Sequence, residues 1–252
     1  MKIIDKIVTD ISWLKSPDKR AMIHLARSLQ NKKGLEIGGP SHFFKPRTYF
    51  PVYLFADVID CVNFGNETIW EGSITEGKTF EYLKGYNKGT QYVSEASELS
   101  QIENNKYDFL LSCHSLEHLA NPLKALKRWN EVLKPGGELA LVLPNKEVTF
   151  DINRPYTNFD HLVQDFENNV SENDTTHFAE ILALHEMSRN PEAKNFEDFK
   201  DLINNNFQQR CAHHHVFSFD VIKKMLEYSG FEVRIQKIVY DLHLFSFAKK
   251  RT

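Results

Sequence analysis

The 252-residue sequence contains few cysteines, no long apolar run and almost no excess of either charge. Cys61, Cys113 and Cys211 are an odd number without metal-ligand spacing, which argues against a disulfide framework and favours a reducing compartment. No stretch approaches the roughly 20 apolar residues that a transmembrane helix needs, and the start lacks the apolar core of a signal peptide. We therefore expect a cytoplasmic protein without membrane insertion.

The charge balance excludes another class of partner. With 31 basic and 34 acidic residues the formal net charge is -3, so the chain lacks a field strong enough to hold nucleic acid. We expect a small-molecule partner instead, and the sequence does not indicate the oligomeric state. The length suits one α/β domain with a buried sheet and a modest insertion.

The clearest pattern lies between residues 107 and 144. Tyr107 to Leu111 is a short apolar run typical of a buried parallel strand, and Ser112-Cys113-His114-Ser115-Leu116-Glu117-His118 follows it. Asn121-Pro122 begins an amphipathic helix that stops at Lys134-Pro135-Gly136-Gly137, and another apolar run follows from Leu139 to Leu143. This succession predicts one right-handed crossover unit of a parallel sheet.

A glycine turn follows an earlier predicted strand. Gly34 to Ile37 leads into Gly38-Gly39-Pro40-Ser41, where a ligand can approach bare backbone. Pro40 and Phe43 occupy the later glycine positions of a G-x-G-x-x-G fingerprint. A ligand without a pyrophosphate therefore fits better than a dinucleotide.

Two further predicted strands end at carboxylates. The apolar run Val52 to Ala56 ends at Asp57, which can accept hydrogen bonds from both hydroxyls of a ribose. Asp60 is an alternative, and either residue can be a solvated loop acid. Gln91 to Ser94 predicts a third strand, after which Glu95 and Ala96 can pair with the amino edge of an adenine and leave room for its ring.

Together these segments resemble the class I S-adenosylmethionine (SAM) dependent methyltransferases, of the type 11-like kind. The resemblance rests on Leu35 to Gly39, Asp57, Glu95-Ala96 and above all residues 107 to 137. It implies an α/β fold, namely a Rossmann-like seven-stranded, mostly parallel sheet with an antiparallel last strand and helices on both faces. It also implies that SAM is the cofactor.

The resemblance implies cofactor contacts by position. Gly38 and Gly39 would face the methionine part, Asp57 the ribose, and Glu95 with Ala96 the adenine, whereas Ser112 to His114 would lie where cofactor meets acceptor. The full set of predicted cofactor-binding residues is Glu36, Gly38, Gly39, Asp57, Glu95, Ala96 and Ser112. Pro40 departs from the family pattern, although Ser41 can still supply a hydrogen bond.

Residues 145–217 lie outside the minimal fold and predict a helical cap insertion over the strand ends. Polar groups gather there: Asp151, Arg154, His161, Asp165, Asp174, His177, Glu180, His185, Glu186 and His213 to His215. We predict that His114, His177 and His214 are catalytic, and that Arg154, His213 and His215 bind substrate. A base pair, a phosphate-binding patch and a metal site remain open, and because the spacing matches no strong ligand motif we assign no metal ligands. His118 is expected to hold the strand-helix turn.

The other segments complete a single domain, residues 1–252. We expect an N-terminal helical segment at 1–33, a SAM-binding core at 34–144, the cap at 145–217, and at 218–252 a helix followed by a strand pair. In the last segment Ser218 is the predicted N-cap and Gly230 the helix end.

Our first hypothesis is a SAM-dependent methyltransferase acting on a small acceptor. Thr149 to Pro155, Asp174 to Glu180 and His213 to Phe217 resemble a bacterial subgroup associated with surface-polysaccharide gene sets. That resemblance implies a sugar, a sugar nucleotide or a phosphorylated precursor as acceptor, methylated on oxygen. The alternatives are a non-catalytic SAM-binding or partner-binding module with the same fold, and a nicotinamide-dependent oxidoreductase, against which the missing glycines argue.

Overall fold

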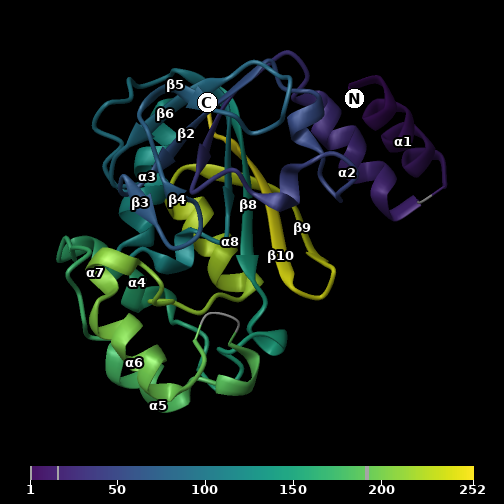
Figure 1. The fold of residues 1–252 in the computed structure, drawn as a ribbon. Coiled ribbons are helices and arrows are strands. Elements are labelled where there is room, and N and C mark those ends of the chain that lie inside the picture. The colour runs from purple at the N-terminus through teal and green to yellow at the C-terminus, as the bar shows by residue number, and fades with distance from the viewer. Residues whose placement is uncertain (1, 16, 191–192) are drawn as a thin grey trace.

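The computed structural model describes residues 2–15, 17–190 and 193–252, and a twisted eight-stranded sheet with helices on both faces is its centre (Figure 1). The strand order is β5-β6-β2-β1-β7-β8-β10-β9. The strands are β1 (Lys33–Ile37), β2 (Val58–Asn63), β5 (Gly77–Phe80), β6 (Gly89–Val93), β7 (Tyr107–Cys113), β8 (Leu133–Pro144), β9 (Phe231–Val239) and β10 (His243–Lys250).

The five strands from β6 to β8 are parallel, and β10 pairs antiparallel with both β8 and β9. The predicted Rossmann-like, mostly parallel α/β fold is therefore confirmed. The predicted count of seven strands is wrong, because the short β5 pairs antiparallel with β6 and adds an edge. It lies in a polar segment without the apolar alternation that indicates a strand.

Helices pack against both faces of the sheet because neighbouring strand residues point to opposite sides. In β7, Leu110 belongs to the core under α3 (Pro122–Val132) and α8 (Phe219–Tyr228), whereas Leu111 belongs to the core that α2 (Pro17–Ser28) contributes to. The other N-terminal helix, α1 (Lys2–Lys15), packs on α2. No helix in these three described ranges is long and apolar enough to cross a bilayer.

Two helix starts follow the predicted capping chemistry. The Asn121 side chain accepts a hydrogen bond from the Lys124 N–H at the start of α3, and Pro122 fills the first turn. The Ser218 side chain caps α8 by accepting from Val221 N–H. Both predicted starts are confirmed.

The cap, residues 145–217, gathers below the end of β8 (Figure 1). It contains α4 (Phe159–Glu167), α5 (Phe178–Leu184), α6 (Phe196–Asn204), α7 (Asn206–Gln209) and the 3-10 turns η4 (Lys146–Val148) and η5 (Met187–Arg189). Ile181, Phe199 and Ile203 form part of its own small apolar core. Residues 210–218 return to α8 without regular secondary structure, and Arg210 at their start is left-handed with φ +56°.

The second strand begins six residues later than expected. Val52 to Leu54 forms a 3-10 turn, η2, and the strand is β2, Val58–Asn63. A short buried apolar run fits a buried helical turn as well as a strand, so periodicity alone misplaces it. The other short elements are η1 (His42–Phe44), η3 (Leu116–His118), β3 (Glu67–Thr68) and β4 (Gly72–Ser73).

Candidate functional site

A cavity of about 550 Å³ opens at the carboxyl ends of the parallel strands, between the sheet and the cap. This is the edge at which α/β sheets bind ligands, and 300–1,000 Å³ is the usual size of a ligand site. Residues that line it include Gly38, Ser41, Asn63, Phe64, Trp70, Glu71, Ser94, Glu95, Ala96, His114, Glu117, His118, Thr149, Phe150, Arg189, Arg210 and His213.

The turn after β1 is shaped by a buried carboxylate. Glu36 accepts hydrogen bonds from Ser41 N–H at 2.9 Å and from the Tyr53 hydroxyl at 2.6 Å. Burial raises the pKa of Glu36 to about 7, and a Cβ at Gly39 would collide with its carboxylate. Glu36 and Gly39 therefore form the turn without lining the cavity, whereas Gly38, at φ +73°, does line it.

Arg210 lines the cavity on the side where β6 ends. Its guanidinium lies 2.5 Å from Glu95 Oε1 and 2.7 Å from Glu172 Oε2, and it packs over the Phe64 ring. The other Glu95 oxygen is buried and accepts no hydrogen bond from the described residues. Sequence reasoning missed Arg210, because only the folded cap brings it to Glu95.

Two groups at the end of β7 are held in unusual states. His114 has φ +51°, and its Nε2 lies 2.9 Å from His243 Nδ1; burial lowers the pKa of His114 to about 3, so the ring is neutral. Glu117 is fully buried, neither carboxylate oxygen accepts a hydrogen bond within the described part of the chain, and burial raises its pKa to about 7. Sequence reasoning missed both Glu117 and His243.

His213 reaches the cavity from the cap, and its Nδ1 lies 2.5 Å from Asp151 Oδ2. Burial by itself lowers the pKa of His213, but the Asp151 carboxylate outweighs burial and raises it above the usual range. The same contact, with Arg154, more than offsets burial at Asp151 and brings its pKa to about 2. The pair is thus an ionised carboxylate beside an unusually basic imidazole.

Glu117, His118 and His213 form the cavity cluster. Their ligand atoms all lie within 4.8 Å of one another, so the cluster can share a proton or hold a cation. The backbone joins its two halves, since His214 N–H donates to the Glu117 carbonyl at 2.8 Å. His118 also contacts the cap directly through Ala212, at 3.2 Å from Nδ1 to the carbonyl oxygen.

Several predicted site residues lie away from the cavity. Asp57 precedes β2 and lines a recess at the opposite end of the sheet, and Asp60 is bound inside the sheet by Lys33 and Tyr107. Ser112 is fully buried within β7 beside Ile37. The structure therefore does not bring Asp57, the predicted ribose ligand, to this cavity, and at the carboxyl end of β2 the residue that lines it is Asn63.

Four cap residues with predicted roles also lie away from the cavity. The Arg154 guanidinium is buried, and four of its five N–H groups donate to Asp151, Glu180 and the carbonyls of His213 and His214, so these four bonds hold it inside the cap. The side chain of His214 contacts Asn206 at 3.2 Å. His177 and His215 belong to a separate cluster in the cap. None of these four residues lines the cavity within the described structure.

A family model described as a methyltransferase domain matches residues 19–236. The chain belongs to this methyltransferase family. Among curated proteins no sequence matches it. Its fold resembles a protein from Bacillus halodurans C-125 assigned as a methyltransferase, with 14% identity, a TM-score of 0.51 and coverage of 94% of this chain and 100% of the other. It also resembles a SAM-dependent methyltransferase from Mesorhizobium loti, with 10% identity, a TM-score of 0.51 and coverage of 94% and 100%.

The cavity of this methyltransferase suits SAM, its cofactor. SAM carries a positive sulfonium and a positive amino group, and the acidic residues that line the cavity are Glu71, Glu117 and Glu95, of which Glu95 is paired with Arg210. Gly38 has no space for a side chain, because a Cβ there would lie 2.5 Å from Ser115 Oγ and its φ is +73°. The enzyme is thus SAM-dependent, and what remains to be argued is the acceptor.

Proposed function

We propose that the enzyme methylates a hydroxyl oxygen of a small polar acceptor, of the sugar, sugar-nucleotide or phosphorylated-precursor class used in surface polysaccharides. The observation that carries the proposal is the His213–Asp151 pair at the cavity, with Nδ1 and Oδ2 2.5 Å apart. A hydroxyl must lose its proton when it takes a methyl group, so this reaction needs a base. Methylation of an already nucleophilic amine or thiolate does not need one.

His213 is suited to be that base. Asp151 occupies Nδ1 and fixes the tautomer, which leaves Nε2 to accept the acceptor's hydroxyl proton. The raised pKa of His213 increases its basicity, and the residue works only in the neutral form, so turnover rises with pH above the usual histidine range. Glu117, with its pKa near 7, lies in the same cluster and can take the proton onward.

The cofactor would occupy the sheet side of the cavity. Gly38 and Ser41 would hold its methionine part, Asn63 its ribose, and Glu95 with Ala96 its adenine. Bound SAM supplies an electrophilic methyl group, and the protein then has to align the acceptor oxygen and exclude water. Phe150 and Leu119 line the cavity near the cavity cluster and help to exclude water.

The acceptor would enter from the cap side. Thr149 and Arg189 line the cavity there, and the described contacts of the Arg189 guanidinium include a hydrogen bond to the Glu147 carbonyl at 3.0 Å. A hydroxyl and a guanidinium suit a hydroxylated or phosphorylated molecule. The resemblance of residues 149–155 and 213–217 to the surface-polysaccharide subgroup supports the same class.

The test is a panel of nucleotide sugars and sugar phosphates, scored by SAM consumption and by the position of the new methyl group. We expect O-methylation of at least one member. His213→Asn should lower turnover by about 10²-fold or more while SAM affinity stays within twofold, and His24→Asn, at an exposed position on α2, serves as the control. Methylation at nitrogen or carbon, or full turnover by His213→Asn, would remove the proposal.

A further inference from the structure

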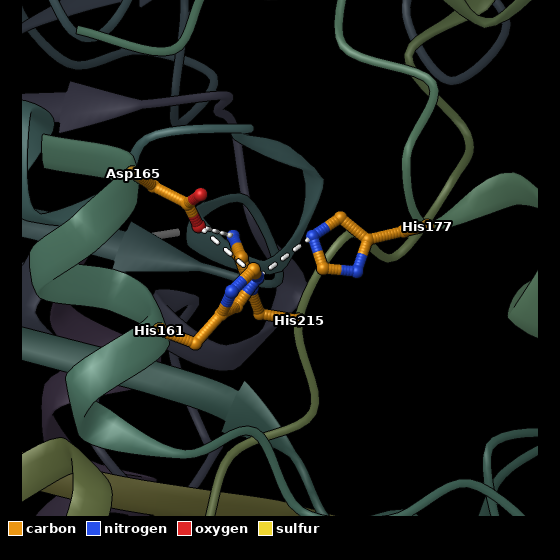
Figure 2. A group of neighbouring side chains, drawn as sticks. All are labelled: His161, Asp165, His177 and His215. Carbon is orange, nitrogen blue, oxygen red and sulfur yellow. Dashed lines mark hydrogen bonds and ion pairs between the residues drawn. The ribbon is translucent and has the colours of Figure 1, made fainter. Parts of the chain in front are cut away.

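A second group of metal-ligating side chains lies in the cap, outside the cavity. Its members, His161, Asp165, His177 and His215, form the cap cluster. Figure 2 shows that His161 and Asp165 project from α4, whereas His177 and His215 approach from separate segments, and that all four point toward one another. The ligand atoms all lie within 4.8 Å of one another.

We propose that the cap cluster binds one divalent transition-metal ion, with zinc as the occupant. The proposal departs from the sequence-based expectation of no metal ligands, which rested on ligand spacing. Only His161 and Asp165 are close in sequence, and the other two ligands come from the start of α5 and from the 210–218 segment. A spacing motif cannot reveal a site of that kind.

The distances in the cap cluster suit tetrahedral coordination. His161 Nε2 lies 3.1 Å from His177 Nε2 and 3.3 Å from Asp165 Oδ2, and one ligand atom of His215 lies within 4.8 Å of these atoms. Zinc bonds to nitrogen and oxygen of about 2.0–2.2 Å at tetrahedral angles separate the ligand atoms by about 3.3–3.6 Å. Small side-chain shifts would bring all four atoms to that separation.

Unsatisfied polar atoms give independent support. Asp165 Oδ2 and His215 Nδ1 are buried and have no hydrogen-bond partner within the described ranges. A buried carboxylate oxygen without a partner is costly, and a cation would remove that cost. His215 Nε2 lies 3.2 Å from the Ala120 carbonyl, an arrangement in which one ring nitrogen donates and the other keeps its lone pair for a metal.

The types of ligand in the cap cluster also suit a transition metal. Three imidazoles and one carboxylate favour zinc or a neighbouring first-row ion over magnesium or calcium, which prefer oxygen ligands. Four protein ligands leave no open position, so the ion is structural.

The ion would tie α4 and the start of α5 to the segment that presents His213. His215 is two residues from His213, and the His214 N–H is already bonded to the Glu117 carbonyl. The metal would therefore keep the cavity cluster in place without taking part in methyl transfer. Its loss is expected to loosen the cap more than it lowers the chemical rate.

The experiment is metal analysis of the full chain, purified without a metal-binding tag and equilibrated with buffered zinc. We expect one zinc ion per chain in the parent and in the control Glu167→Gln, an exposed position on α4. The double variant His161→Gln/His177→Gln should hold less than about a fifth of a zinc ion per chain. Zinc should raise the unfolding midpoint of the parent by about 5 °C or more and that of the double variant by less than about 1 °C.

His213→Asn separates the two clusters, because it should keep the zinc. No bound zinc in the parent, zinc retained by the double variant, or zinc lost from His213→Asn would each overturn the proposal. Where the double variant does not fold, Asp165→Asn and a zinc titration of the chelator-treated parent answer the same question. These readouts do not depend on the acceptor, so they stand apart from the proposed methyl transfer.

Discussion

The cavity cluster and the cap cluster contain the same kinds of side chain but differ in what surrounds them. Glu117, His118 and His213 line a cavity large enough for a ligand, and Asp151 backs one of their rings. The cap cluster lies outside that cavity and is closed by four protein side chains. Both clusters take a member from the short run His213 to His215.

Under the two proposals made above, access to the cavity and not residue type distinguishes a base from a structural metal ligand. An imidazole that faces a cavity can exchange a proton with a bound molecule, whereas one surrounded by other ligand groups can hold only an ion or a hydrogen bond. The comparison also predicts that changes to the two clusters will have different signatures. Changes at the cavity should act on turnover, and changes in the cap on stability.

The largest expected effect follows from Asp151→Asn. The change removes the partner that fixes His213 and leaves Arg154 buried beside a neutral amide, so turnover should fall by about 10²–10³-fold and stability by about 3 kcal/mol. Steady-state kinetics and denaturant unfolding measure the two quantities, with exposed Glu232→Gln as control. Unchanged turnover would show that the pair is only structural.

The next effect concerns pH. The pKa of Glu117 is raised from 4.5 to about 7, so the folded state keeps a proton that the unfolded state releases, and stability falls as pH rises from about 4.5 to 7. Glu117→Gln removes that dependence, which is worth up to about 3 kcal/mol. Unfolding free energies of both proteins at pH 5 and pH 8 (roughly the two sides of the titration) test this. Equal pH slopes in the two proteins would contradict it.

A smaller effect is expected on the cap side. In zinc-saturated protein, Asp165→Asn should lower the unfolding midpoint by about 5 °C, because it removes one ligand, while turnover changes by less than about threefold. Thermal unfolding and kinetics with Glu167→Gln alongside provide the comparison. A 10²-fold (about two orders of magnitude) loss of turnover with an unchanged midpoint would mean that the cap cluster takes part in the chemistry.

The smallest effect is expected from Asp57→Ala. Asp57 is exposed before β2 at the end of the sheet away from the cavity, so SAM affinity should stay within about twofold of the parent. The matched change Asn63→Ala, at the carboxyl end of β2, should weaken SAM binding by about tenfold. Calorimetry with SAM compares the two variants, and the reverse order would return the ribose site to Asp57.

Much of the core could be predicted from the sequence because its signals are local. The apolar run after Tyr107, the Asn121-Pro122 start and the Ser218 cap depend on a few neighbouring residues, and the structure has each of them. The family resemblance, which rests largely on the same segments, gave the cofactor. The position of the second strand was predicted wrongly, because a buried 3-10 turn and a buried strand can have the same apolar pattern.

The cap behaved differently because its functional groups are paired over long sequence separations. The sequence predicts that Arg154 binds an anionic substrate. In the structure its hydrogen-bond partners are Asp151, Glu180 and two backbone carbonyls. His177 and His214 likewise contact other cap residues, His161 and Asn206, and do not line the cavity. Hydrogen bonds between residues far apart in the sequence produce no periodic pattern, so the sequence does not predict them.

The sequence by itself determined the alternation of strands and helices and the position of the glycine turn, since these follow from local apolar periodicity and from turn and capping residues. Only the tertiary structure decided which histidine reaches the cavity and which joins the cap cluster. His213, His214 and His215 are chemically identical and adjacent. Their surroundings differ because the folded cap brings Asp151 to the ring of His213, Asn206 to that of His214 and Asp165 to that of His215.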